Sequence, residues 1–591
     1  MGNGRKYTHG PSFETGGIRF RLWAPGEASV GLALADKPDI VPMEPRGDGF
    51  FEAFVEGVGE GALYRFVLPD GTRVPDPASR FQPADVHGPS EIIDPCAYAW
   101  SETWAGLAWE DVVLYELHLG AFTRQGTFDG AAEMLDYLAA LGVTAVEIMP
   151  VADFSGKRGW GYDGVLLYAP DASYGRPERF KAFVEAAHAH GIAVLLDVVY
   201  NHFGPDGNYL PLYAPDFFTS RHKTPWGDAI NFDGPNARPV REFVIENAEY
   251  WIDEFHLDGL RLDAVHAIKD MSRPDILDEL AERMRSRFDR PIHLLLENEN
   301  NEPQRLRRAQ GRPVRYTAQW NDDVHHVLRV AATGQQTGYY ADYGETRLIG
   351  RALAEGFAYQ GEHSRHRNAP RGGPSADLPP SAFVAFIQNH DQVGNRAFGE
   401  RLSVLAPSPA VRALASVYLL LPQIPMLFMG EEWGAEEPFL FFCDFKGDLA
   451  AAVREGRRRE FARFPEFADP GSVARIPDPL SEETFLASKL DWSKVDADRL
   501  AFYKAALAAR RTYVRPLVPE IGRGGEWAAL GEEAVRVTWT AGARRLVLDA
   551  NLSDKPVSCP PARGPIFWRG GEADESETLG AWGVRWSLEG P

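Results

Sequence analysis

Residues 259–266 read GLRLDAVH, a short apolar run that ends on the carboxylate of Asp263. The same succession recurs at three other places along the chain. LLD closes an apolar run at 195–197, LLLEN closes one at 294–298, and QNHD closes one at 388–391. Short apolar runs of this kind are typical of buried parallel strands. Polar groups at their carboxyl ends are the arrangement that a TIM barrel uses for its active site.

Apolar runs like these alternate with amphipathic stretches through the middle of the chain. The amphipathic stretches include Asp129–Leu141, Arg179–His190 and Arg241–Phe255. Eight β/α alternations predict an α/β fold of the (β/α)8 TIM barrel type rather than a doubly wound sheet. The predicted strands are Val112–Leu117, Thr144–Met149, Ile192–Asp197, Gly259–Asp263, Ile292–Glu297, Val314–Gln319, Phe383–Gln388 and Ile424–Met429.

The sequence on both sides of this region has a different pattern of apolar and polar residues. Short alternating segments separated by Gly, Pro and Asp predict an N-terminal β-sandwich. Short β-like runs return near the C-terminus, at Ala534–Trp539 and Arg545–Asp549, and predict a small β domain. We therefore expect three domains. They are a carbohydrate-module-like β-sandwich over 1–98, a catalytic barrel with inserted loops over 99–512, and the C-terminal β domain over 513–591.

Composition and charge narrow the class of partner and the cell compartment. Lys and Arg number 62 against 84 Asp and Glu, which gives a formal net charge of -22. Such a surface repels phosphate backbones, so we expect no nucleic-acid partner. The three cysteines lie far apart and show no zinc or disulfide spacing. With no apolar signal core and no long apolar run, the expected location is the cytoplasm, without membrane contact.

The carboxylates at the ends of the fourth and fifth predicted strands suit glycoside hydrolysis. One carboxylate attacks the anomeric carbon, and a protonated one releases the leaving oxygen. Retaining enzymes hold the two about 5–5.5 Å apart, and neighbouring strands lie about 4.8 Å apart. Arg261 lies two residues before Asp263 on the same strand face, where it favours the ionised form. Like charge and partial burial would raise the pKa of Glu297.

Four stretches resemble, in order and spacing, the motifs of the α-amylase family. That resemblance implies a (β/α)8 barrel with Asp263 as nucleophile, Glu297 as general acid/base and Asp391 as the third catalytic carboxylate. Many relatives have Ala where Leu296 precedes the acid, so Glu299 or Glu302 is the alternative acid. The four stretches are DVVYNH at 197–202, GLRLDAVH at 259–266, LLLEN at 294–298 and QNHDQ at 388–392.

The same resemblance implies substrate contacts around the carboxylates. His202 and His390 would bind the sugar ring in the cleaved subsite, and Tyr162 would stack on it, unless the histidines only pack. The polar cluster after the sixth strand would line the leaving-group side, unless its Asp residues simply cap a helix. The predicted substrate-binding residues are Tyr162, Asp197, His202, Arg261, Leu262, Ala264, Val265, His266, Trp320, Asn321, Asp322, Asp323, His325, His326, His390, Gln392, Asn395 and Arg396.

Other stretches narrow the substrate within the family. FRLWAP at 20–25 resembles the module that precedes the barrel in branching and debranching enzymes. VPDPASRFQPADVHGPS at 74–90, WNDDVHH at 320–326 and FMGEEWG at 428–434 resemble the trehalose-releasing members. The implied reaction is retaining hydrolysis of the α-1,4 bond next to the terminal trehalose of maltooligosyltrehalose. A maltooligosyltrehalose synthase would be a metabolic companion, with no physical complex implied.

Two alternatives remain open at this point. A glucan branching or debranching enzyme of the same family would carry the same carboxylates but act on another substrate. A non-catalytic, glycan-binding amylase-like protein would lack one or more of them. The sequence contains no HExxH motif and no paired CxxC. We therefore expect no cofactor and no metal, including calcium near Asn201.

Overall fold

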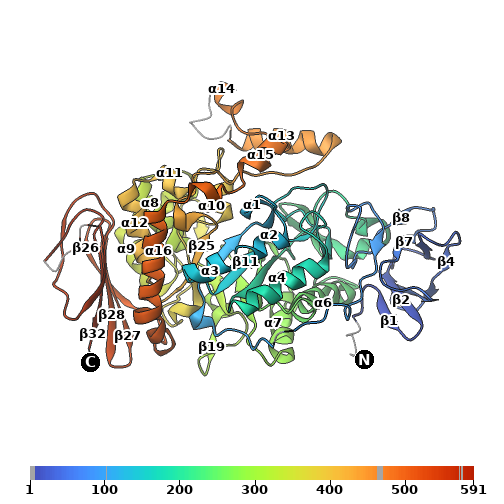
Figure 1. The fold of residues 1–591 in the computed structure, drawn as a ribbon, viewed down its shortest axis with the longest axis horizontal. Helices are drawn as coiled ribbons and strands as arrows, with labels where there is room; N and C mark the ends of the chain where they lie inside the picture. Colours follow the sequence, from blue (N-terminus) through green and yellow to red (C-terminus); the bar gives the residue numbers. More distant parts are fainter. Residues whose placement is uncertain (1–6, 102, 462–469, 572, 574–576, 591) are drawn as a thin grey trace.

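The computed structural model describes residues 7–101, 103–461, 470–571, 573 and 577–590. Within these residues, eight parallel strands close into a central barrel, with β-sheets flanking it at both ends of the molecule (Figure 1). The strands follow one another around the barrel in chain order, and stretches with helices connect them. The predicted (β/α)8 barrel is therefore confirmed.

Each predicted strand overlaps one strand of the barrel, but the sixth begins later than expected. Val314 is 48% exposed, because the chain before it turns back in a two-stranded hairpin of β19 (Arg308–Ala309) and β20 (Arg312–Pro313). The barrel strands are β10 (Leu114–Leu117), β11 (Ala145–Ile148), β14 (Ala193–Val198), β17 (Gly259–Leu262), β18 (His293–Leu296), β21 (Ala318–Trp320), β24 (Phe383–Ala385) and β25 (Ile424–Phe428).

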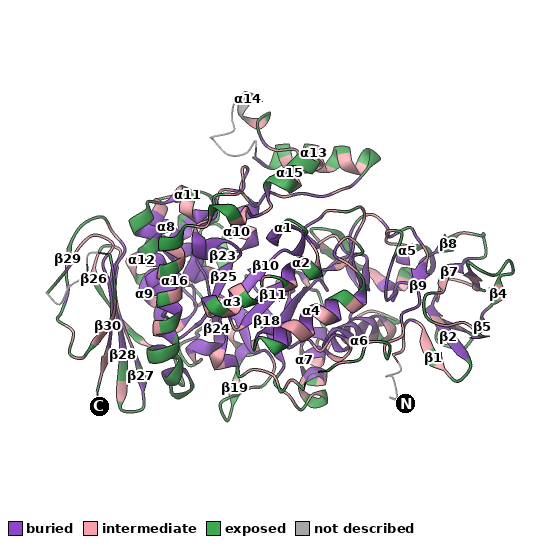
Figure 2. Cartoon of the chain, in the orientation of Figure 1, coloured by how far each residue is buried: buried purple, intermediate pink, exposed green. Residues whose placement is uncertain are grey.

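Helices cover the outside of the barrel, and their buried faces lie against the strands (Figure 2). The stretch 129–141, predicted as one helix, forms two, because the chain tightens where Met134 N donates to Ala131 O at 3.1 Å. No helix among the described residues has the length and apolar content needed to cross a membrane. The principal helices are α2 (Phe128–Ala132), α3 (Leu135–Leu141), α4 (Pro177–Ala189), α6 (Ala237–Glu254), α7 (Ile276–Arg287), α8 (Asp322–Thr333), α9 (Thr346–Glu355), α12 (Ser408–Tyr418) and α16 (Ala497–Ala509).

The N-terminal part consists of two antiparallel sheets that share a core. Buried and partly buried residues alternate along β2 and β3, so that Phe20, Leu22 and Leu32 point into that core. One sheet is β1 (Ser12–Glu14), β2 (Gly17–Trp23), β6 (Phe50–Glu56) and β5 (Glu44–Pro45). The other is β4 (Val41–Pro42), β3 (Gly31–Leu34), β7 (Leu63–Val67) and β8 (Arg73–Val74), with β9 (Ser90–Glu91) beside β7.

The C-terminal part is a small β domain packed against the barrel helices. Trp539 and Trp586 stack in its core with ring centroids 5.8 Å apart. Trp586 Nε1 donates to Ser416 O of α12 at 2.8 Å, which joins this sheet to the barrel. The main sheet is β26 (Glu526–Gly531), β27 (Ala534–Ala541), β28 (Arg544–Asn551), β32 (Val584–Glu589) and β30 (Ile566–Gly570). A two-stranded sheet pairs β29 (Val557–Ser558) with β31 (Thr578–Leu579).

Two buried glutamates after β25 tie separate elements together. Glu431 and Glu432 open the short helix η7 (Glu431–Trp433) and are at most 5% exposed. Burial raises the pKa of each carboxyl to about 7. Tyrosine hydroxyls supply the hydrogen bonds that these buried groups need. Glu431 accepts from Tyr418 of α12 and Tyr503 of α16, and Glu432 accepts from Tyr115 of β10 and Tyr137 of α3.

This arrangement predicts a pH-dependent loss of stability. Folding favours the protonated form of Glu432, so its stabilising contribution falls as pH rises from about 5 to about 7. Glu432→Gln lacks that titration. The free energy of unfolding of Glu432→Gln minus that of the native chain should therefore increase as pH rises over this range, by on the order of 3 kcal/mol. Thermal unfolding between pH 5 and pH 8 measures the difference. The exposed Glu455→Gln is the control, and a constant difference for Glu432→Gln would contradict the prediction.

Candidate active site

Asp263 and Glu297 lie side by side at the carboxyl-terminal rim of the barrel. Leu262 of β17 pairs with Leu296 of β18, and the two carboxylates are the next residues of the two strands. Glu297 N donates to Leu262 O at 3.1 Å, and Val265 N donates to Glu297 O at 3.0 Å. The backbone therefore fixes both residues at the same height on neighbouring strands.

The guanidinium of Arg261 joins the carboxylates of three strands. It is fully buried inside the barrel, and the ring of Trp320 lies 4.0 Å from its central carbon. Its Nη1 donates to Asp197 Oδ2 at 2.7 Å and to Asp263 Oδ1 at 2.9 Å. Its Nη2 donates to Glu297 Oε2 at 2.9 Å. Two amino groups of one side chain thus hold Asp263 and Glu297 together.

Asp263 is held in its ionised form. Burial raises the pKa of its carboxyl, but the charge of Arg261 and a hydrogen bond from Asn201 outweigh burial, so the pKa falls below its usual value. Asn201 Nδ2 donates to Asp263 Oδ2 at 2.7 Å and to Asp263 O at 2.8 Å. His202 contacts Asn201 Oδ1 and stacks on Trp226, with ring centroids 4.1 Å apart. An ionised carboxylate here is suited to nucleophilic attack.

The surroundings of Glu297 favour its protonated form. Burial raises the pKa of its carboxyl well above the usual value, against the charge of Arg261, and the charges of Asp263 and Asp391 raise it further. Ala264 N donates to Glu297 Oε2 at 2.8 Å and fixes the carboxyl group in place. Two adjacent carboxyl groups with opposite pKa shifts are the arrangement that separates a base or nucleophile from an acid.

A hydrogen-bonded chain connects the first, second, third and seventh strand ends behind these carboxylates. Glu116 of β10 accepts from His390 N at 3.1 Å and lies 2.5 Å from His390 Nδ1. Burial lowers the pKa of His390, but Asp391 and Glu116 raise it above its usual value overall. His390 Nε2 lies 2.8 Å from the hydroxyl of Tyr162, which donates to Asp197 Oδ2 at 2.6 Å. Tyr162 and His390 also stack, at 5.1 Å between centroids.

A cavity of about 370 Å³ opens beside Glu297. Of the predicted site residues, it is lined by Glu297, Asp322, His326, Asp391, Gln392 and Asn395. Asp391 is the most accessible carboxylate of the proposed triad, with its side chain 38% exposed. The remaining lining residues come from the segment between the sixth and seventh strands or follow the fifth, and of these only Glu299 was predicted, as the alternative acid. They are Glu299, Tyr339, Asp342, Tyr343, Ser364, His366, Arg367 and Arg371.

Several residues predicted to contact substrate are buried and do not line this cavity, and as substrate contacts they stay predictions. Asn321 Nδ2 donates to Gly356 O and Gln423 Oε1, while Asp323 accepts from Asn301 and Tyr343. His325 is 1% exposed, and its two ring nitrogens bond Ile387 O and the hydroxyl of Tyr340. These side chains are buried, and their polar groups bond to other parts of the chain. Buried outside the cavity lining are Leu262, Val265, Trp320, Asn321, Asp323 and His325.

Two further predicted residues lie at the margin. His266 is partly exposed and lies 3.9 Å from Glu299, and Arg396 pairs with Glu400 at 3.1 Å. Neither is among the residues that line the cavity. They stay predictions as substrate contacts.

The alternative acids have surroundings unlike those of Glu297. Burial raises the pKa of Glu299, but His266 and Arg367 lower it below its usual value overall, so that group is ionised. Glu302 accepts from Asn298 Nδ2 at 2.9 Å and lies 3.7 Å from Arg305. Neither is bonded to the guanidinium that holds Asp263. This geometry favours Glu297 as the proton donor.

Sequence reasoning missed four residues that shape the site. Glu116 is the next-to-last residue of the first barrel strand, so the strand-end rule that found the other carboxylates points close to it. Asn201 was considered only as a calcium ligand, yet it donates to Asp263. Arg371 and Tyr343 lie in connecting segments where no sequence signal marks them. Among the described residues, no group of three or more His, Cys, Asp or Glu side chains is placed to hold a metal ion.

An eight-stranded barrel with two carboxyl groups of opposite pKa shift on neighbouring strand ends is the architecture of an α-amylase-type glycoside hydrolase. A family model described as "Alpha amylase, catalytic domain" matches residues 78–213. A second, described as a domain of unknown function (DUF3459), matches residues 522–586 in the C-terminal part.

Relatives of nearly the full length identify the family. The chain is 45% identical to a malto-oligosyltrehalose trehalohydrolase from Saccharolobus solfataricus, over 86% of this chain and 87% of the relative. It is 43% identical to one from Deinococcus radiodurans, over 84% and 81%. A crystal structure from Salmonella typhimurium shares 46% identity and a TM-score of 0.94, covering 99% of this chain and all of that one. The chain belongs to the malto-oligosyltrehalose trehalohydrolase family.

The hydrogen bond from Asn201 gives a test of the charge on Asp263. Asn201→Ala removes a donor from an ionised carboxylate, which is worth about 1.5–3 kcal/mol. The pKa of Asp263 should therefore rise, by about one unit for each 1.4 kcal/mol lost. Because the predicted nucleophile must be ionised to react, the acid limb of kcat/KM should move to higher pH. Asn300→Ala, an exposed neighbour of the site, serves as control. An acid limb that stays in place would show that Asn201 does not set the charge.

Proposed function

We propose that this chain hydrolyses the α-1,4-glucosidic bond next to the terminal trehalose of maltooligosyltrehalose, releasing trehalose and a maltooligosaccharide. The observation that carries the chemistry is the single guanidinium that bonds both Asp263 and Glu297. The substrate is proposed from relatives at 45% and 43% identity that are named malto-oligosyltrehalose trehalohydrolase.

In the first step, the Asp263 carboxylate attacks the anomeric carbon of the maltooligosyl unit. The bond from that carbon to the glycosidic oxygen breaks, and Glu297 gives its proton to this oxygen. Trehalose leaves with a new hydroxyl, and the sugar remains joined to Asp263 as an ester. The lowered pKa of Asp263 and the raised pKa of Glu297 support these roles.

In the second step, the ionised Glu297 takes a proton from water. The water oxygen attacks the anomeric carbon, the ester bond to Asp263 breaks, and the maltooligosaccharide departs with the α configuration retained. Both groups return to their starting protonation states. Asp391 would bind sugar hydroxyls as the ring distorts, a role that its exposed position beside Glu297 in the cavity supports.

We assign the cavity beside Glu297 to the leaving trehalose. Its lining includes Glu297 and Asp391 but not Asp263, and a leaving group departs on the side of its proton donor. Tyr339 and Tyr343 offer aromatic faces to sugar rings, and Asp322 and Arg371 offer hydrogen bonds to hydroxyls. On the other side of Asp263, Trp226 stacked on His202 would meet the maltooligosyl part.

We also propose the domain boundaries, location and companions expected from the sequence. The last strand of the N-terminal sheets ends at Glu91, before the first barrel strand begins at Leu114, which supports a boundary near residue 98. The match over 522–586 lies inside the proposed C-terminal domain, 513–591.

Three free cysteine thiols suit a reducing cytoplasm. The net charge of -22 disfavours nucleic acid. The synthase that makes the substrate is a metabolic companion only.

The catalytic roles predict a sharp contrast among three variants. Asp263→Asn and Glu297→Gln should each lower kcat by at least about a thousandfold, since loss of the nucleophile or of general acid catalysis has effects of this order. Glu299→Gln, on the alternative acid, should keep kcat within about tenfold. Trehalose release from maltooligosyltrehalose measures turnover, and thermal unfolding confirms that each variant is folded. Near-normal turnover by Glu297→Gln, or collapse in Glu299→Gln, would overturn the assignment.

The substrate is tested by product analysis on three glucans. Maltooligosyltrehalose should yield free trehalose, with kcat/KM at least about tenfold above that for a plain maltooligosaccharide of equal length. A branched glucan should react no faster than the plain chain. Chromatography of early products measures all three. Faster cleavage at α-1,6 branches would point to a debranching enzyme, and new branches in a linear glucan would point to a branching enzyme.

A further inference from the structure

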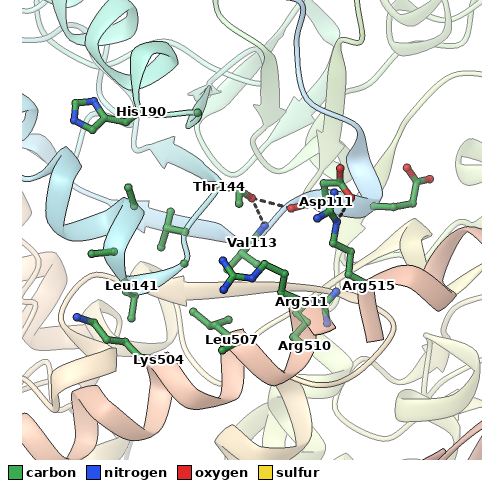
Figure 3. Close-up of a pocket in the computed structure, with 17 residues that line it drawn as sticks. Asp111, Val113, Leu141, Thr144, His190, Lys504, Leu507, Arg510, Arg511 and Arg515 are labelled. Atoms are coloured by element: carbon green, nitrogen blue, oxygen red, sulfur yellow. Dashed lines mark hydrogen bonds and ion pairs between the residues drawn. The ribbon is translucent and has the colours of Figure 1, made fainter. Parts of the chain in front are cut away.

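A second cavity, of about 320 Å³, lies at the end of the barrel opposite the carboxylates. Its walls include Asp111 and Val113 before β10, Thr144 before β11 and Gly191 before β14. These residues precede strands whose other ends carry the active site. We name this cavity the basal pocket. Figure 3 shows it between the strand entrances and the helix that follows the barrel.

One stripe of the last barrel helix supplies basic side chains to the basal pocket. Helix α16 continues into η10 (Arg510–Val514), a π-helical turn, and η11 (Arg515–Glu520). Pocket residues on this segment follow one another at three- and four-residue steps, as on one helix face. π-helical turns inside α-helices are frequent at functional sites. The residues of the stripe are Lys504, Leu507, Ala508, Arg511 and Arg515.

The cations of the basal pocket differ in how they are engaged. Arg510 is buried, and its guanidinium donates to the backbone oxygens of Leu419 and Gln423, at 3.2 and 2.9 Å. Arg515 is paired with Asp111. Lys504 and Arg511 form no hydrogen bond or ion pair with any part of the chain that the structure describes. Two cations on one wall therefore remain available to an incoming anion, while Glu110 contributes one carboxylate to the same lining.

The basal pocket also has an apolar surface and a size suited to more than a bare ion. Val113, Leu141 and Leu507 line it beside the cations. Its volume lies in the range of small-molecule sites, about 300–1,000 Å³. A concave site with cations on low-dielectric walls concentrates anions, even in a chain of net charge -22. Arg and Lys side chains are the usual protein ligands of phosphate.

We propose that the basal pocket binds the phosphate ester of a sugar-sized molecule. The phosphate would lie between Lys504 and Arg511, and the carbon skeleton would lie against Val113, Leu141 and Leu507. This site is independent of the reaction proposed for the barrel rim, since the two cavities share no lining residue.

Isothermal titration calorimetry on the full chain tests the proposal with three probes. Glucose 6-phosphate should bind saturably and more tightly than inorganic phosphate, and glucose should not bind. Lys504→Ala with Arg511→Ala should weaken glucose 6-phosphate binding at least about tenfold. Lys504→Gln with Arg511→Gln should do the same, which guards against misfolding of the alanine variant. The control is Arg458→Ala with Arg459→Ala, two exposed arginines of α13 (Gly447–Phe461), which should bind normally.

Each remaining outcome counts against the site. Inorganic phosphate that binds as tightly as glucose 6-phosphate would show a site for the free ion and overturn the ester proposal. No saturable binding by the native chain would overturn it too. Equal binding of glucose 6-phosphate by the folded glutamine variant would place that probe elsewhere. Hydrolysis of maltooligosyltrehalose by the Lys504 and Arg511 variants is measured separately. It distinguishes a failure of the phosphate-ester proposal from a failure of the assignment at the barrel rim.

Discussion

The active site depends on one buried cation, Arg261, which bonds carboxyl groups of three strands at once. A charge buried inside a barrel is costly unless it is paired and hydrogen-bonded. The strands supply those partners only when the barrel is closed in its observed register, with Asp197 beside Arg261 and Leu262 beside Leu296. The interaction that orders the carboxylates therefore also stabilises the correctly closed barrel.

The shared guanidinium does not make Asp263 and Glu297, the two carboxyl groups that we propose as catalytic, alike. Arg261 lowers the pKa of both, so the difference between them comes from their other neighbours. Asp263 gains a side-chain donor in Asn201, whereas Glu297 faces the charges of Asp263 and Asp391 in a buried position. The pKa of one carboxyl falls and that of the other rises because the strand ends place them asymmetrically around one cation. The neighbouring groups therefore determine the proposed roles of the two carboxyl groups as much as the carboxyl groups themselves do.

Which parts of the fold and of the site could be predicted from the sequence depends on whether they are set by local sequence patterns or by tertiary contacts. The strand positions and the rim carboxylates depend on local periodicity and on the strand-end rule, and all eight strands were located. Val314 was misassigned because its apolar character does not reveal the hairpin before it. The bonds of His325 to Ile387 O and Tyr340 could not be predicted from the sequence, because tertiary packing sets the rotation of that side chain on α8. Arg371 was missed because it reaches the cavity from a segment without periodicity.

The cavity beside Glu297, which we assign to the leaving trehalose, indicates that the class of enzyme and its substrate are determined by different parts of the chain. The barrel rim contributes Glu297 and Asp391, which any member of the α-amylase type needs. Most of the other lining comes from the segment between β21 and β24, which includes η5 (Gly338–Asp342) and the hairpin β22 (His363–Ser364) with β23 (Ala369–Pro370). In TIM barrels, connecting segments of this kind determine which substrate the same fold accepts. A shared rim beside a wall built by such a segment can serve different glucans, and our proposal places the recognition of trehalose in that wall rather than in the carboxylates.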